Sequence, residues 1–138
     1  MTEVLSKENL IAKLSSGCKV REDWRIGTEH EKFGFKKKDL RPITFDDIQK
    51  IFSELCSKYK WEKIIENKKI IGLKKDATSI TLEPGGQIEL SGAPVKNLFE
   101  TCKEVNLHQD ELNAVCRNYE IEFMGIGVLP KWKLSELK

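Results

Sequence analysis

Two carboxylates lie two positions apart in a stretch of the chain that has the pattern of a β-strand. The stretch runs from Trp24 to Phe35 and contains Glu29 and Glu31. Because successive side chains on a strand point to opposite faces, Glu29 and Glu31 share one face of the sheet. Two like charges about 7 Å apart at Cα repel each other unless a cation lies between or above them. The spacing therefore predicts a sheet that gathers carboxylates on one face.

A second segment with the same character is a predicted hairpin around Pro84-Gly85-Gly86. Its apolar residues alternate with polar ones: Leu82, Ile88 and Leu90 against Glu83, Gln87 and Glu89. We expect the apolar set to face the helices and the acids to occupy the open, concave side. If this hairpin pairs with the strand at Glu29, up to four carboxylates would meet. The sequence alone does not establish which strands are neighbours.

Length and charge limit the class of protein. With 138 residues, 39% of them hydrophobic, the chain is long enough for one soluble domain with a core. Its 24 Lys and Arg nearly balance its 22 Asp and Glu, so we expect neither nucleic acid nor a membrane surface as a partner. No apolar run reaches membrane-spanning length and no signal peptide is evident, which favours a cytoplasmic protein. The four cysteines lack the spacing of a zinc site.

Hydrophobic periodicity predicts three helices. The first lies within residues 4–15. The second follows Thr44, a favourable N-cap residue, and has an apolar stripe of Phe45, Ile48, Ile51, Phe52, Leu55 and Tyr59. The third extends from about Val95 to Asn118, with an expected inner face of Leu98, Phe99, Cys102, Val105, Leu112 and Cys116. In this third helix we interpret His108 as a structural residue.

Between the second and third helices the pattern changes to short alternating runs. They predict the strands Trp61–Ile65, Lys69–Lys74, Thr78–Leu82 and Gln87–Ser91. Two more strands are expected, one beginning at Trp24 and one over Tyr119–Val128. The elements together predict an α+β domain, in which a curved antiparallel sheet has helices on one face.

Four longer motifs occur in order along the chain, at Gly27–Phe35, Leu82–Pro94, Thr101–Asn106 and Gly125–Trp132. Together they resemble the plant and proteobacterial type of glutamate–cysteine ligase (γ-glutamylcysteine synthetase). The resemblance implies a glutamine-synthetase-like fold and ATP-dependent joining of the L-glutamate γ-carboxylate to L-cysteine, through a γ-glutamyl phosphate. This reaction is the first step of glutathione synthesis. The resemblance also implies Mg²⁺ as a cofactor, and ATP, L-glutamate and L-cysteine as partners.

The resemblance assigns roles to individual acids. Glu29 and Glu31 fall on the family's paired metal-binding positions, and Glu89 falls on a third. Glu83 and Gln87 are assigned to ATP binding, although Glu83 could instead stabilise the adjoining turn or contact substrate. No residue is assigned as a catalytic group. The competing interpretation is that these acids line an ordinary solvated sheet face.

Enzymes of the resembled family are several hundred residues long. Residues 1–138 are therefore expected to be the N-terminal part of a single catalytic domain. The expected partner of this part is the C-terminal part of the same enzyme, which these residues lack. In this interpretation the 138 residues alone are inactive. The alternative is a non-catalytic fragment, or a remnant of the same fold that binds a metal or small molecule.

Overall fold

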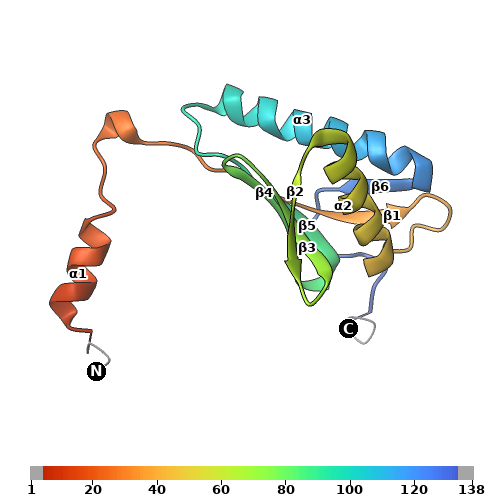
Figure 1. Ribbon diagram of the computed structural model, residues 1–138, viewed down its shortest axis with the longest axis horizontal. Coiled ribbons are helices and arrows are strands. Elements are labelled where there is room, and N and C mark those ends of the chain that lie inside the picture. The colour runs from red at the N-terminus through yellow and green to blue at the C-terminus, as the bar shows by residue number, and fades with distance from the viewer. Residues whose placement is uncertain (1–4, 134–138) are drawn as a thin grey trace.

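The computed structural model describes residues 5–133. Its helices are α1 (Lys7–Ser15), α2 (Phe45–Tyr59) and α3 (Leu98–Cys116). Its strands are β1 (Glu29–Lys36), β2 (Glu62–Glu66), β3 (Lys69–Lys75), β4 (Thr78–Glu83), β5 (Gln87–Ser91) and β6 (Ile121–Met124). Short 3₁₀ turns lie at Arg21–Asp23, Pro84–Gly86 and Arg117–Tyr119. The arrangement is shown in Figure 1.

The described strands form one sheet in the order β2-β3-β4-β5-β1-β6. Every neighbouring pair is antiparallel, so β2 to β5 form the predicted meander. Strand β1 comes earlier in the chain but lies between β5 and β6. The predicted α+β class is confirmed, and β1 is the neighbour of the β4–β5 hairpin.

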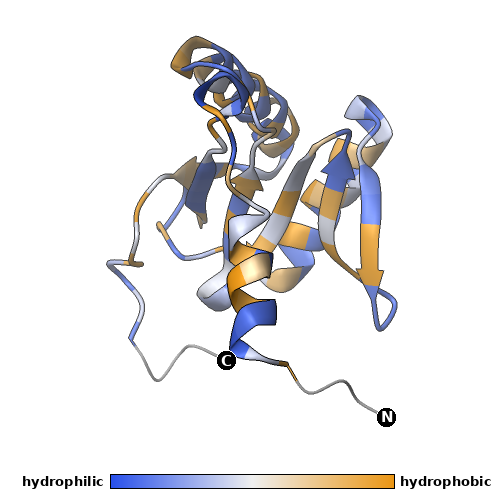
Figure 2. Ribbon diagram, turned by 90° about the vertical axis from the view of Figure 1, so that its left-hand side faces the viewer, coloured by the Kyte–Doolittle hydropathy of each residue, from blue (hydrophilic) through white to orange (hydrophobic). Residues whose placement is uncertain are grey.

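The core lies between one face of the sheet and the helices α2 and α3. Its fully buried residues include Ile51, Phe52, Leu55, Leu73, Ile80, Ile88, Leu90, Leu112 and Val115. Each such side chain contributes roughly 1.5–3 kcal/mol through removal from water. Figure 2 shows the alternation of hydrophobic and hydrophilic residues along the strands. The expected orientation of the hairpin is confirmed, because Ile88 and Leu90 face the helices.

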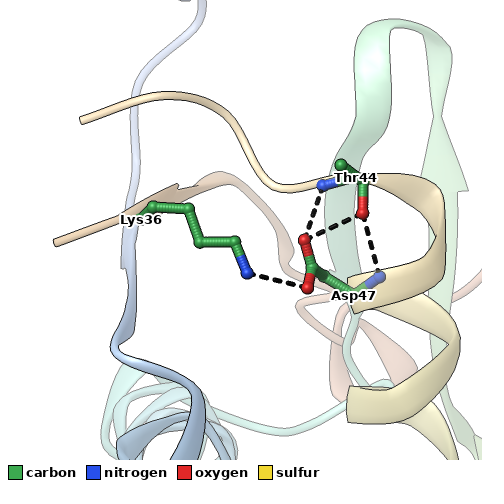
Figure 3. Close-up of polar contacts among 3 residues, drawn as sticks. All are labelled: Lys36, Thr44 and Asp47. Atoms are coloured by element: carbon green, nitrogen blue, oxygen red, sulfur yellow. Dashed lines mark hydrogen bonds and ion pairs between the residues drawn. The ribbon is translucent and has the colours of Figure 1, made fainter. Parts of the chain in front are cut away.

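Helix α2 begins with a capping box that also ties it to β1. The Thr44 hydroxyl accepts the backbone N–H of Asp47 at 3.2 Å, and the Asp47 carboxylate accepts the backbone N–H of Thr44 at 2.9 Å. Lys36, the last residue of β1, donates to the same carboxylate at 2.7 Å (Figure 3). The N-cap predicted at Thr44 is confirmed, and the ion pair joins the end of β1 to the start of α2.

Helix α3 exists where expected, but the predicted inner face was partly wrong. Phe99 is 87% exposed, and Leu98 and Cys102 are exposed as well. The buried face comprises Thr101, His108, Glu111, Leu112, Val115 and Cys116. Packing of the last turns against α2 and the sheet sets the rotation of the helix. The same face, traced back toward the N-terminus, is polar.

The N-terminal region lies apart from the sheet in Figure 1. The helix α1 forms as predicted, yet its apolar residues are exposed, Leu14 at 79%. The strand expected from Trp24 begins only at Glu29, because its partner β5 ends at Ser91 and the regular ladder stops there. A single bridge between Ile26 and Val95 continues the pairing.

The last predicted strand is also shorter than expected. Glu120 has a left-handed backbone, with φ of 51°, so extended structure begins only at Ile121. The strand ends at Met124, before Gly125. Within residues 5–133, none of the helices has the length and apolar character needed to cross a bilayer.

Candidate functional site

The strand register brings two of the predicted metal ligands face to face. Glu31 on β1 is the direct partner of Glu89 on β5. Side chains of directly opposed residues have Cβ atoms about 5 Å apart. Both carboxylates lie on the sheet face that the helices do not cover, because Leu90 and Ile88 beside Glu89 occupy the covered face. The sheet therefore gathers acids on one face.

The third predicted ligand, Glu29, occupies the next row. It lies opposite Ser91 and is thus a diagonal neighbour of Glu89, at a typical distance of about 7–8 Å. The Ser91 hydroxyl donates a hydrogen bond of 2.6 Å to Glu89 Oε1. This bond fixes the orientation of one carboxylate and leaves its second oxygen, Oε2, available.

Glu83 and Gln87 lie at the closed end of the hairpin, where they are register partners. Glu83 accepts a long bond of 3.5 Å from the Thr81 hydroxyl. It also borders a cavity of about 850 Å³ that lies mainly between the start of α2 and the Pro84–Gly86 turn. Gln87 is buried, and its amide donates to the Ile126 carbonyl at 3.4 Å. In this arrangement Gln87 anchors the segment that follows β6, whereas Glu83 lies beside the turn.

A metal ion imposes a stricter requirement than proximity. Among the described residues, no three His, Cys, Asp or Glu side chains converge closely enough to hold an ion. Mg²⁺, however, is usually bound by one or two carboxylates together with water and phosphate oxygens. The opposed pair Glu31 and Glu89 supplies two carboxylates, whose oxygens are the hard donors that Mg²⁺ prefers. These two residues therefore fit Mg²⁺, whereas Glu29 lies one row farther away.

Directly behind the acids lies a residue that the sequence analysis did not consider. Lys32 is 1% exposed, on the helix-covered face of β1, and its ammonium donates to the His30 carbonyl at 3.0 Å. Burial lowers the pKa of Lys32 to about 8. The signal was available in the sequence, since Lys32 occupies an inward position by the same alternation that turns Glu31 outward.

The sequence model of glutamate–cysteine ligase family 2 matches residues 25–138. Glutamate–cysteine ligase A, chloroplastic, of Oryza sativa subsp. japonica is 55% identical over 99% of this chain and 28% of the relative. The chloroplastic glutamate–cysteine ligase of Arabidopsis thaliana is 51% identical over 99% of this chain and 26% of the relative. The corresponding protein of Medicago truncatula is 48% identical over 99% of this chain and 27% of the relative.

The chain spans about a quarter of the length of these curated relatives. All three are named chloroplastic, which contradicts the cytoplasmic location expected from the sequence. That expectation was wrong because it used the absence of a signal peptide, a feature that does not distinguish cytoplasm from plastid.

The match to the family model extends over more than half of the chain. The chain therefore belongs to glutamate–cysteine ligase family 2.

Proposed function

We propose that this chain supplies the metal-facing sheet of an ATP-dependent ligase that joins the γ-carboxylate of L-glutamate to the amine of L-cysteine. Such a reaction would be the first step of glutathione biosynthesis. The names of the relatives support the reaction class. One observation supports placing the metal site on this face: Glu31 and Glu89 lie directly opposite each other on the uncovered side of the sheet.

Phosphoryl transfer depends on alignment and charge neutralisation more than on covalent chemistry by the protein. Mg²⁺, when bound, would offset the negative charge of the ATP phosphates. Glu31 and Glu89 would hold the ion, Ser91 would orient the Glu89 carboxylate, and Glu29 would contribute from the next row. Glu83, which shares a face of the β4–β5 hairpin with Glu89, would face the nucleotide. Gln87 would contribute to nucleotide binding indirectly, because its bond to the Ile126 carbonyl holds the segment that follows β6 in place.

We further propose that residues 1–138 are the N-terminal part of one catalytic domain. The chain covers only about a quarter of the length of the relatives, which supports its being one part of a longer domain. In that case the 138 residues bind Mg²⁺ and ATP weakly and do not turn over. The names of the relatives also support a plastid location for the whole protein.

The test compares three variants in a protein completed to the length of its relatives. Glu31→Gln and Glu89→Gln remove one charge each and keep the side-chain shape, whereas Glu66→Gln on β2 changes an exposed acid far from the site in the sheet order. We expect ADP release that requires both glutamate and cysteine, and we expect the first two variants to lower it roughly a hundredfold. The loss should be partly recovered at high Mg²⁺, and Glu66→Gln should match the unsubstituted protein.

The alternative is a non-catalytic member that binds a metal or small molecule. It predicts Mg²⁺ or ATP binding by calorimetry without ADP release that depends on both amino acids. Unchanged turnover of Glu31→Gln and Glu89→Gln at low Mg²⁺ would instead show that the acids are ordinary surface residues.

A further inference from the structure

Strand β6 forms one end of the sheet, and within residues 5–133 its outer edge has no partner strand. On its inner side it pairs with β1, where Met124 lies opposite Phe33 and Glu122 lies opposite Phe35. Figure 1 shows β6 at the end of the sheet, below α3. The outer edge of a strand in this position presents backbone N–H and C=O groups that another segment can pair with.

The opposite edge of the sheet, β2, is protected in a way that β6 is not. On β2 the register shifts between Ile64 and Ile65, and both ends of the strand are charged, with Glu62 and Glu66. Bulges and charges are usual means by which proteins prevent an edge strand from pairing. Strand β6 keeps a regular register with β1 and has a single charged residue, Glu122. Its edge is therefore open to pairing.

On the uncovered face of the sheet, β6 borders an apolar pocket of about 170 Å³. Glu122 and Met124 line it from β6, Phe35 lines it from β1, and Ile126 and Pro130 line it from the segment that follows β6. Met124 is 56% exposed, so its side chain is accessible. The pocket is smaller than the roughly 300–1,000 Å³ of most ligand sites, and it therefore suits one apolar side chain.

On the helix-covered face, the same strand borders a polar pocket of about 380 Å³. Ile121 and Phe123 line it from β6, whereas Gln109, Asn113 and Arg117 line it from the end of α3 and the turn after it. Successive side chains of a strand alternate between faces. The free edge of β6 thus has an apolar pocket on one face and a polar pocket on the other.

The polar pocket contains a cation that no acid neutralises. The Arg117 guanidinium has neither an ion pair nor a hydrogen bond within the described part of the chain, whereas Lys37 is paired with Glu122 at 2.7 Å. Gln109 donates to Asn113 Oδ1 at 3.2 Å, which leaves the Asn113 amide nitrogen as a further donor. An arginine can bind a carboxylate through two parallel hydrogen bonds. The pocket therefore favours an acidic side chain.

We propose that the free edge of β6 binds an extended segment from the part of the same protein that follows these residues. The segment adds a strand to the sheet, with an apolar side chain in the pocket beside Met124 and an Asp or Glu carboxylate at Arg117. In this mode of binding, backbone hydrogen bonds provide affinity and pockets for alternate side chains provide specificity.

The source of the segment follows from length. The chain covers only about a quarter of its relatives, so a long stretch of protein is available to pair with β6. The inference therefore rests on the proposal that residues 1–138 are one part of a longer catalytic domain. It adds to that proposal the place where the two parts join and the chemistry of the joining segment.

The first test is made in the protein completed to the length of its relatives. Met124 is replaced by the photoreactive amino acid p-benzoylphenylalanine, and the cross-linked peptides are identified by mass spectrometry. We expect a cross-link from position 124 to a residue beyond position 138 of the same molecule. The same replacement of Ile65, which is 61% exposed on the protected edge β2, is the control and should cross-link far less.

Hydrogen exchange provides a second readout that needs no bulky probe. Exchange of the amides of residues 121–124 is followed by mass spectrometry in the completed protein and in its Arg117→Gln variant. We expect Arg117→Gln to speed this exchange about tenfold, because the added strand loses its charged partner. Lys103→Gln, at an exposed position near the other end of α3, removes the same charge and should leave the exchange unchanged.

The two readouts can overturn the inference separately from the proposed function. Absence of a cross-link beyond position 138, a cross-link to a second molecule, or equal exchange in Arg117→Gln and the parent would each refute the pairing. ADP release that depends on glutamate and cysteine is measured on the same preparation. Absence of ADP release with the cross-link present would refute the proposed function alone, whereas ADP release without the cross-link would refute only the pairing at β6.

Discussion

Glu31 on β1 lies directly across the ladder from Glu89 on β5, and both are on the uncovered face of the sheet. Like charges at directly opposed positions destabilise a sheet. A pair of this kind lowers the stability of the chain alone, but it is well placed to hold a divalent cation. The next residue of β1, Lys32, lies buried on the other face.

Removing one charge of this pair should stabilise the metal-free chain. We expect Glu31→Gln to raise the free energy of unfolding by about 0.2–1 kcal/mol in low-salt buffer, because repulsion by Glu89 is lost. Urea denaturation monitored by circular dichroism measures the change, and 1 M NaCl should reduce it. In the control Glu66→Gln the register partner is Lys69, so no gain is expected. A less stable Glu31→Gln would contradict the repulsion.

The ion pair at the start of α2 should show a defined pH dependence. Burial raises the pKa of Asp47, but the hydrogen bonds from Lys36 and Thr44 outweigh it and hold the pKa below its usual value. The group therefore stabilises the folded state above about pH 4, and this contribution is lost as the pH falls through the folded-state pKa.

We expect Asp47→Asn to cost about 1 kcal/mol at pH 7, since Asn keeps an oxygen for Thr44 but loses the charge that pairs with Lys36. Urea denaturation at pH 7 and at pH 3 should show the difference between variant and parent shrinking at the lower pH. Asp46→Asn, in the same first turn, is the control and should cost less. An equal cost at both pH values would exclude the ion pair as its origin.

The rotation of α3 can be tested by two truncations on the same helix. Leu112 is fully buried, so Leu112→Ala should cost about 2–5 kcal/mol of unfolding free energy. Phe99 is largely exposed, so Phe99→Ala should change the stability by less than about 0.5 kcal/mol. Thermal or urea unfolding of both variants decides the matter. Comparable losses would support the inner face that the sequence pattern predicted.

Buried Lys32 should destabilise the fold when it is charged. Burial lowers its folded-state pKa from 10.5 to about 8, so at pH 7 both folded and unfolded states are protonated and the cost is fully present. We expect Lys32→Met to be more stable than the parent at pH 7 by up to about 3 kcal/mol, reduced by loss of the bond to His30.

The parent gains relative to Lys32→Met as the pH rises from 8 to 10.5, because the folded state then releases its proton first. Guanidinium denaturation of both proteins from pH 7 to pH 10.5 should show the difference converging. Lys38→Met, at an exposed position after β1, should show no such convergence. A difference that stays constant across this range would mean that the charge of Lys32 is not what costs stability.

Local patterns in the sequence determined which elements form and which residues share a face. Thr44 identified the start of α2, and the alternation around Glu89 identified the outward side of the hairpin, because capping and the strand period depend only on nearby residues. The same alternation placed Glu29 and Glu31 on one face. The motifs from Gly27 to Trp132 also indicated the family.

The sequence could not determine which part of the protein each helix face or strand edge packs against. Both faces of α3 contain apolar residues, and only packing of Leu112 and Val115 against α2 and the sheet decided that Phe99 points outward and His108 inward. The neighbour relation of β1 and β5, which brings Glu31 to Glu89, joins segments more than fifty residues apart. Periodicity is a property of one segment, whereas these contacts depend on the free energy of packing the whole chain. The tertiary structure therefore decided the partner of each acid, the burial of Lys32 and the free edge of β6.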